Sequence, residues 1–109
     1  MAEPIRADLC IVGAGSAGLS IAAGAAQMGA RTVLIERGLM GGDCLNFGCV
    51  PSKSLLAAAK AAVAWRKGAG FGVEGQPPRI DWARLKAHLA EVIAAIAPHD
   101  SVERFESLG

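Results

Sequence analysis

Two cysteines five positions apart are the residues of this sequence best suited to redox chemistry. Cys44 and Cys49 lie in the stretch GGDCLNFGCVPSK, residues 41–53. The thiolate is the nucleophile in thiol–disulfide exchange, and a nearby cation or helix N-terminus lowers the pKa of a thiol. Because Lys53 follows closely and a helix is expected to start nearby, we predict a thiol with a lowered pKa that reacts at neutral pH.

The cysteine pair has three competing explanations. A zinc site needs four ligands, and the remaining candidates are Cys10, on an expected buried strand, and the distant His88 and His99. Alternatively, both thiols are simply small buried residues. The third explanation is a disulfide that forms and breaks during catalysis.

A disulfide between Cys44 and Cys49 requires the backbone to depart from a regular helix. Residues five apart in a helix have Cα atoms about 8.6 Å apart, whereas a disulfide tolerates about 7 Å. Gly48 relaxes the backbone, and Pro51 lacks an N–H donor and disfavours helix at Val50. So short a loop stabilises a fold by only about 2 kcal/mol, which favours exchange chemistry over a structural role.

A glycine cluster at residues 13–18, Gly-Ala-Gly-Ser-Ala-Gly, forms the second chemical motif. In a dinucleotide site, Gly13 allows a sharp turn, Gly15 leaves room for a pyrophosphate, and Gly18 allows close packing of helix on strand. Ser16 and Ala17 begin the helix, whose free amides and dipole favour an anion.

The elements around the glycine cluster form one βαβ unit, which makes the fold class α/β. Residues 8–12 predict a strand buried on both faces. A helix from about Ser16 to Met28 follows, with Gly29 as a left-handed cap, and residues 32–35 predict a second strand. Glu36 then lies where an acid accepts hydrogen bonds from the adenosine ribose. A tight turn without a ligand is the other interpretation, and these residues do not separate FAD from NAD.

Composition limits the class of protein. The chain has 109 residues, 52% of them hydrophobic and 19% charged, which indicates a globular chain of at most one domain. The formal net charge is +1 and aromatic residues make up 5%, so we predict no nucleic-acid partner.

A membrane segment and a secreted protein are also disfavoured. The uncharged run from Leu9 to Ala30 is long enough to span a bilayer, but its glycines favour a buried strand followed by a packed helix. Glu3 and Asp8 precede this run, unlike the basic leader of a signal peptide. Three cysteines are too few for a secreted disulfide framework. A cytoplasmic protein is expected.

The rest of the chain predicts helices. An alanine-rich helix extends to about Lys67, and residues 68–78 predict a loop. Asp81 is a candidate N-cap, and Pro98 is expected to end the next helix. Asp100 or Ser101 could cap a final helix. We expect packing roles for Trp65 and for the apolar stripe Trp82, Leu85, Leu89, Val92, Ile93 and Ile96.

The two motifs together resemble the FAD-dependent pyridine nucleotide-disulfide oxidoreductases, the family of dihydrolipoamide dehydrogenase, mercuric reductase and glutathione reductase. The resemblance covers residues 7 to about 67 closely, with Asp43 where threonine is more usual. It implies that Cys49 lies against the flavin, that Cys44 attacks the substrate and that Lys53 approaches the flavin's reactive edge. The FAD-binding positions that it implies are Gly13, Gly15, Ser16, Ala17, Gly18, Glu36, Arg37, Gly42, Asp43 and Lys53.

The resemblance also implies a reaction and an organisation. Electrons pass between NAD or NADP, the flavin, the disulfide and a substrate, which is a small-molecule or protein disulfide or dithiol, or mercuric ion. Residues 1–109 are then the N-terminal part of a Rossmann-type FAD-binding domain, without the NAD(P) and dimerisation domains of a homodimer. Alternatives are an FAD- or NAD-binding module with inert cysteines, or an inactive fragment.

Overall fold

A parallel βαβ unit forms the first third of the chain. The computed structural model describes residues 2–109. Strand β1 (Leu9–Val12), helix α1 (Ser16–Gln27) and strand β2 (Thr32–Ile35) follow one another, and the two strands pair in parallel. Gly29 follows α1 with a φ of +87°, the left-handed conformation expected of a glycine cap. The predicted βαβ unit is confirmed.

The two-stranded sheet is covered on one face only. Ile11, on the face that α1 covers, is only 9% exposed. Val12 is 82% exposed, and Cys10 is also exposed. The prediction that β1 is buried on both faces, with Cys10 inside, is therefore wrong. Side chains alternate between the faces of a strand, and none of residues 2–109 covers the second face at Val12.

Helix α2 (Gly42–Asn46) and helix α3 (Cys49–Gly68) carry the cysteine motif. The predicted break in the helix is confirmed, and it falls at residues 47–48. The expectation that Pro51 keeps Val50 out of a helix is wrong, because both are helical. Pro51 is the third residue of α3, where a backbone N–H has no partner within the helix, so its missing donor costs little.

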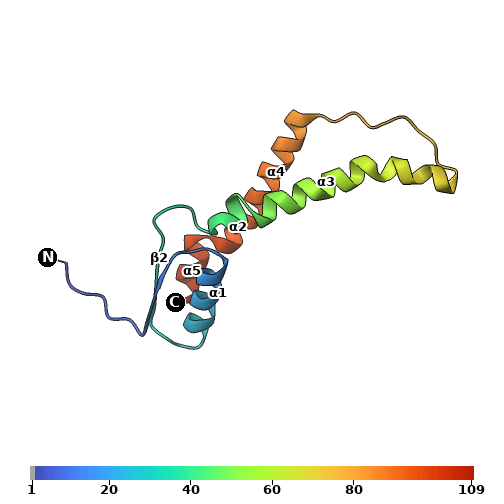
Figure 1. The fold of residues 1–109 in the computed structure, drawn as a ribbon. Coiled ribbons are helices and arrows are strands. Elements are labelled where there is room, and N and C mark those ends of the chain that lie inside the picture. The colour runs from blue at the N-terminus through green and yellow to red at the C-terminus, as the bar shows by residue number, and fades with distance from the viewer. Residues whose placement is uncertain (1) are drawn as a thin grey trace.

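A long arm projects from the βαβ unit (Figure 1). It consists of α3, the short helix η1 (Ala69–Phe71), an irregular connection and helix α4 (Trp82–Ile96), which returns along α3. Asp81 caps α4 as predicted, since its Oδ1 accepts a hydrogen bond from the Arg84 N–H at 3.0 Å.

The apolar stripe of α4 is only partly covered. Leu85, Leu89 and Val92 are half-buried, but Trp82 is 65% exposed. The two helices diverge toward the start of α4 (Figure 1), and Trp82 lines an open cavity between them with Ala59 and Val63 of α3. The prediction that Trp82 is a packing residue is wrong for this part of the chain, whereas Trp65 is half-buried.

The chain then turns back to the βαβ unit. Helix α4 ends before Pro98 as predicted, and η2 (Ala97–Asp100) leads to α5 (Val102–Leu108). Ser101, rather than Asp100, caps α5, because its Oγ accepts from the Arg104 N–H at 3.2 Å. Helix α5 packs beside α1.

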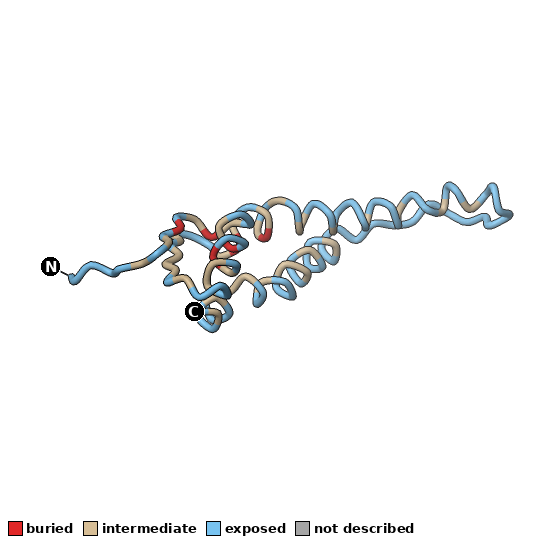
Figure 2. The backbone as a smooth tube through the Cα atoms, turned by 90° about the horizontal axis from the view of Figure 1, so that it is seen from below, coloured by how far each residue is buried: buried red, intermediate tan, exposed pale blue. Residues whose placement is uncertain are grey.

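We call β1, α1, β2, α2 and α5 the lobe, and α3, η1 and α4 the arm. The molecule measures 70 × 27 × 18 Å. Its buried backbone positions gather in the lobe, whereas exposed and half-buried ones make up the arm (Figure 2). The buried apolar residues, all in the lobe, are Ile11, Ala14, Leu19, Ala22 and Leu45.

The uncharged run at Leu9–Ala30 is divided between β1 and α1. Across residues 2–109, no helix combines the length and the apolar character that crossing a membrane requires.

Candidate functional site

The glycine turn between β1 and α1 has the geometry of an anion cradle. Gly13 has a φ of +107°, and a Cβ on Gly18 would collide with the Gly13 carbonyl oxygen. A Cβ on Gly15 would meet nothing within 4 Å. Gly18 therefore allows helix α1 to pack closely on the turn, and Gly15 leaves open space beside it.

The start of α1 leaves amide groups free beside this space. Ser16 and Ala17 are exposed in the first turn. Gly15 is the N-cap residue, and no side chain among residues 2–109 caps the helix. The first amides of a helix lack partners within the helix and carry its positive dipole end. The turn thus fits a pyrophosphate group.

Glu36 braces the glycine turn from the end of β2. Its Oε2 accepts a hydrogen bond from the Ala14 N–H at 2.7 Å, and its Oε1 accepts one from the Gly38 N–H at 2.8 Å. These backbone hydrogen bonds, that from Ala14 first, lower the pKa of the Glu36 carboxyl. The sequence predicts a ribose acceptor here, but no sequence signal indicates that Glu36 also binds the backbone of the glycine turn. Ribose binding by Glu36 stays a prediction.

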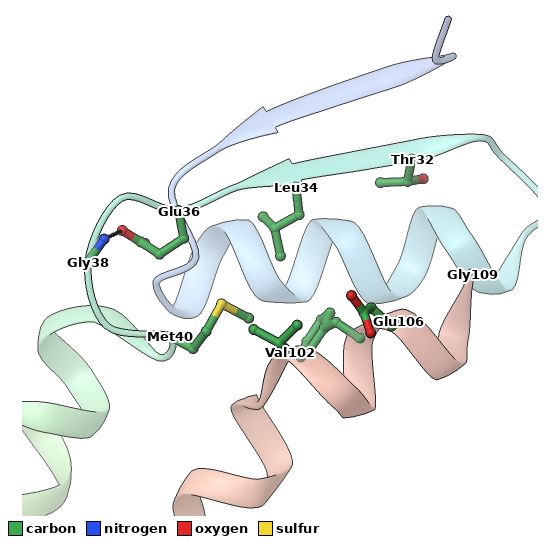
Figure 3. Close-up of a pocket in the computed structure, with 9 residues that line it drawn as sticks. Thr32, Leu34, Glu36, Gly38, Met40, Val102, Glu106 and Gly109 are labelled. Carbon is green, nitrogen blue, oxygen red and sulfur yellow. Dashed lines mark hydrogen bonds between the residues drawn. The ribbon is translucent and has the colours of Figure 1, made fainter. Parts of the chain in front are cut away.

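Glu36 also lies at a cavity of about 460 Å³ between β2 and α5. Figure 3 shows Glu36 reaching from the end of β2 toward Gly38, with Met40 across from Val102 of α5. Arg37, the next residue, is exposed.

The cysteine motif lies directly on the glycine turn. The Gly41 N–H donates to the Ala14 carbonyl oxygen at 2.8 Å, and a Cβ on Gly42 would lie 2.8 Å from the Gly15 Cα. Gly41 and Gly42 have φ values of +91° and +59°. Only glycine meets both demands at Gly42, the left-handed backbone and the close contact. The two sequence motifs therefore form one site.

Gly48 brings the two cysteines together. A Cβ on Gly48 would lie 2.9 Å from the Asp43 carbonyl oxygen and 3.5 Å from the Cys44 Cα, so the chain folds back tightly onto the first cysteine. Cys44 lies in the middle of α2, and Cys49 is the first residue of α3. Both are free thiols here.

The pKa of the Cys44 thiol is raised from its usual 9.0. The largest cause is a side-chain hydrogen bond with Cys49, followed by desolvation, while Lys53 acts in the opposite direction. The predicted lowering of a thiol pKa is therefore wrong for Cys44 in this dithiol state. A neighbouring thiol that shares a hydrogen bond outweighs an exposed lysine one turn further along α3.

Cys44 also lines an open cavity of about 400 Å³ between α1, α2, the start of α3, the end of α4 and α5. Leu19, Leu45 and Phe105 give it apolar walls, and Ser16 and Arg104 add polar groups.

The remaining predicted site residues are exposed. Asp43 lies in the first turn of α2, and Lys53 lies one turn after Cys49 on α3. In residues 2–109, no group of three or more His, Cys, Asp or Glu side chains is arranged to hold a metal ion.

Comparison with known proteins identifies relatives across nearly the whole chain. Residues 7–104 match the model of the family described as pyridine nucleotide-disulphide oxidoreductase. The dihydrolipoyl dehydrogenase of Bacillus subtilis is 37% identical over 90 residues, which are 81% of this chain and 20% of that protein. The mercuric reductase of Streptomyces lividans is 42% identical over 79 residues, 72% of this chain and 17% of that protein.

Solved structures agree on the fold. The Cu(II) complex of the HOCl-induced flavoprotein disulfide reductase RclA from Escherichia coli superimposes with a TM-score of 0.65 at 27% identity. The match covers 85% of this chain and 18% of that one. The predicted α/β fold, a Rossmann-like FAD-binding part of a disulfide reductase, is confirmed. The chain spans about a fifth of the length of the curated relatives it matches, and it belongs to the pyridine nucleotide-disulfide oxidoreductase family.

Proposed function

We propose that this chain is the FAD-binding and dithiol-bearing part of an enzyme that transfers electrons between a nicotinamide cofactor and a disulfide substrate. The observation that carries the proposal is the contact between the two motifs, in which Gly42 packs on Gly15. This contact places the thiol pair beside the turn that fits a pyrophosphate. A binding module with inert cysteines would have no need of that contact.

The glycine turn and the first turn of α1 hold the FAD pyrophosphate in this proposal. Glu36 holds the adenosine ribose, Arg37 lies next to it, and the segment with Gly42, Asp43 and Lys53 contacts the flavin half. When bound, FAD carries the electron pair between the nicotinamide cofactor, NAD or NADP, and the disulfide.

The chain's own chemistry is thiol–disulfide exchange. The Cys44 thiolate attacks one sulfur of the substrate disulfide, whose S–S bond breaks and releases a thiolate that takes up a proton. The Cys49 thiolate then attacks the Cys44 sulfur, which releases the second substrate thiol and forms the Cys44–Cys49 bond. Two electrons and two protons thus pass from the dithiol to the substrate, and the reverse sequence oxidises a dithiol.

The cavity at Cys44 supports the assignment of Cys44 as the thiol that attacks the substrate. Cys44 lines it together with residues of α1 and α5, and we assign it to a disulfide of small-molecule size that reacts with Cys44 while Cys49 attacks from α3. A protein disulfide or mercuric ion is the second substrate class to test, because the mercuric reductase of S. lividans is also a relative.

Further features of the whole protein are part of the same proposal. Residues 1–109 form the N-terminal portion of an FAD-binding domain, and NAD(P)-binding and dimerisation domains complete a cytoplasmic homodimer. The exposed Trp82 and the open face of the sheet at Val12 are apolar surfaces that such further parts of the protein would cover.

Thiol counting on the full-length protein tests the proposal. We expect the protein as purified to contain bound FAD and a Cys44–Cys49 disulfide, so that neither of these two thiols is alkylated before reduction. Addition of NADH or NADPH should expose Cys44 and Cys49 to alkylation, as mapped by peptide mass spectrometry. Bound flavin with both thiols already free, and unchanged by either cofactor, would instead support the binding module with inert cysteines.

A further inference from the structure

Helix α2 carries Cys44 but is too short to be stable by itself. It has five residues, whereas isolated helices shorter than about 12 residues are marginal in water. Gly41, its N-cap residue, offers no side chain for capping. Something outside the helix ladder must therefore fix the orientation of Cys44.

Asn46, the last residue of α2, provides this restraint. Its Nδ2 donates to the Gly42 carbonyl oxygen at 2.9 Å and to the Met40 carbonyl oxygen at 3.2 Å. One hydrogen bond reaches back past Cys44 to Gly42 at the start of the helix, and the other reaches Met40 in the preceding loop. The amide thus closes α2 against the loop that precedes it.

The loop that Asn46 holds is the one that rests on the glycine turn. Gly41 donates to the Ala14 carbonyl oxygen, and Ala14 donates in turn to Glu36. Ala14 is fully buried. A continuous set of hydrogen bonds therefore joins the Glu36 carboxylate, the glycine turn, the loop at residues 40–42 and the helix that carries Cys44.

We infer that Asn46 is a positioning residue, which holds Cys44 in the orientation from which it forms the disulfide with Cys49. The inference rests on the proposed function, because it concerns the same thiol pair. Without the amide, α2 frays and the two sulfurs sample a wider range of separations, which lowers the effective concentration of one thiol at the other. The amide touches neither sulfur, so its effect is on geometry alone.

The test is the equilibrium of the flavin-loaded, full-length protein with a glutathione redox buffer. In that reaction, the S–S bond of glutathione disulfide breaks, two glutathione thiols form, and the Cys44–Cys49 bond takes its place. Acid quenching, alkylation and mass spectrometry give the fraction of disulfide at each ratio. For Asn46→Ala we expect the equilibrium constant for disulfide formation to fall about tenfold, since each lost hydrogen bond changes an equilibrium by a few-fold.

Two further variants separate positioning from general stability. Asn46→Gln keeps the amide on a longer side chain and should recover at least half of the loss on a logarithmic scale. Asp81→Ala also removes a side-chain hydrogen bond to the backbone, the one that Asp81 accepts from the Arg84 N–H at the start of α4, but Asp81 does not line the cavity at Cys44. This variant should leave the disulfide equilibrium unchanged within about twofold.

Alanine is a better helix former than asparagine. A loss of disulfide formation in Asn46→Ala therefore cannot come from a lower helix propensity. An unchanged equilibrium constant in Asn46→Ala would overturn the inference. So would an equal loss in Asp81→Ala, or no recovery in Asn46→Gln. A wild-type protein that forms no Cys44–Cys49 disulfide at any glutathione ratio would overturn the proposed function itself, together with the inference.

Discussion

The lobe and the arm differ in how far their side chains are buried, although they belong to one short chain. In the lobe, β1, β2 and α5 all pack against α1, and the five buried apolar residues lie in these elements, in the glycine turn or in α2. In the arm, α3 and α4 contain no buried residue. Local sequence patterns predict α1, α3, α4 and α5, but not the short helix α2 that carries Cys44. They predict burial correctly only where another part of this chain packs against the apolar face.

The largest expected effect concerns the thiol pair at the edge of the lobe. Cys44→Ser or Cys49→Ser should lower the disulfide reductase activity of the full-length protein by about a thousandfold or more, because each removes a nucleophile. Cys10→Ser is the matched control, since Cys10 is exposed on the open sheet face. It should keep activity within about twofold, and a comparable loss in Cys10→Ser would contradict the assignment of the pair.

Two leucines test the difference in packing directly. Leu45 of the lobe is 3% exposed, and Leu56 of the arm is 61% exposed. Leu45→Ala should reduce the free energy of unfolding by about 2–5 kcal/mol, whereas Leu56→Ala should change it by less than about 0.5 kcal/mol. Denaturant unfolding measures both. A large cost for Leu56→Ala in the full-length protein would show that another part of the protein, or a second copy, covers the arm.

Two glycines of α1 sharpen the comparison within the lobe. Gly18→Ala places a methyl group against the Gly13 carbonyl oxygen, whereas the position at Gly24 is open. We expect Gly18→Ala to cost about 1–3 kcal/mol of stability and to weaken FAD binding. Gly24→Ala should stabilise the protein by about 0.5–1 kcal/mol, because alanine is the better helix former. Similar FAD affinities in the two variants would contradict the role of Gly18 in the turn.

The smallest expected effect is a pH dependence of the protein's stability that comes from Glu36. Its pKa is lowered from 4.5 by the hydrogen bonds from Ala14 and Gly38. A lowered pKa in the folded state contributes stability above the unfolded value, and this contribution is lost as the pH falls through the folded value. The melting temperature of wild type should therefore exceed that of Glu36→Gln near pH 7, and the difference should shrink as the pH falls to about 3.

Glu91→Gln is the control for this measurement, because Glu91 is exposed on the arm. It should show a small difference from wild type that does not vary with pH. A difference for Glu36→Gln that is equally constant would mean that its carboxylate does not hold the turn.

Much of the site could be predicted from residue types and spacing. The glycines and Glu36 follow the requirements of a strand-to-helix turn, and the broken helix between the cysteines follows from disulfide geometry. The break at Gly48 could also be predicted, because glycine relaxes the backbone there, but the close fold-back of Gly48 onto Asp43 could not. The raised pKa of Cys44 could not be predicted either, since it depends on a hydrogen bond between two thiols in adjacent helices.

The errors in the predicted core have one physical cause. Period and composition place Cys10, Val12 and Trp82 on apolar faces. Whether such a face is buried depends on a surface from elsewhere, and residues 2–109 do not supply one at these positions. The hydrogen bonds of Asn46 were missed for a different reason, because they join its side-chain amide to two backbone carbonyl groups that only the folded loop brings within reach.

The central claim is that Cys44 and Cys49 exchange electrons with a flavin held on the glycine turn. Anaerobic titration of the flavin-loaded, full-length protein with NADH or NADPH tests it most directly, with absorption spectra and alkylation followed together. Two electrons should free both thiols and produce a long-wavelength charge-transfer band, which Cys49→Ser abolishes. Bleaching of the flavin without that band, with the number of free thiols unchanged, would contradict the account.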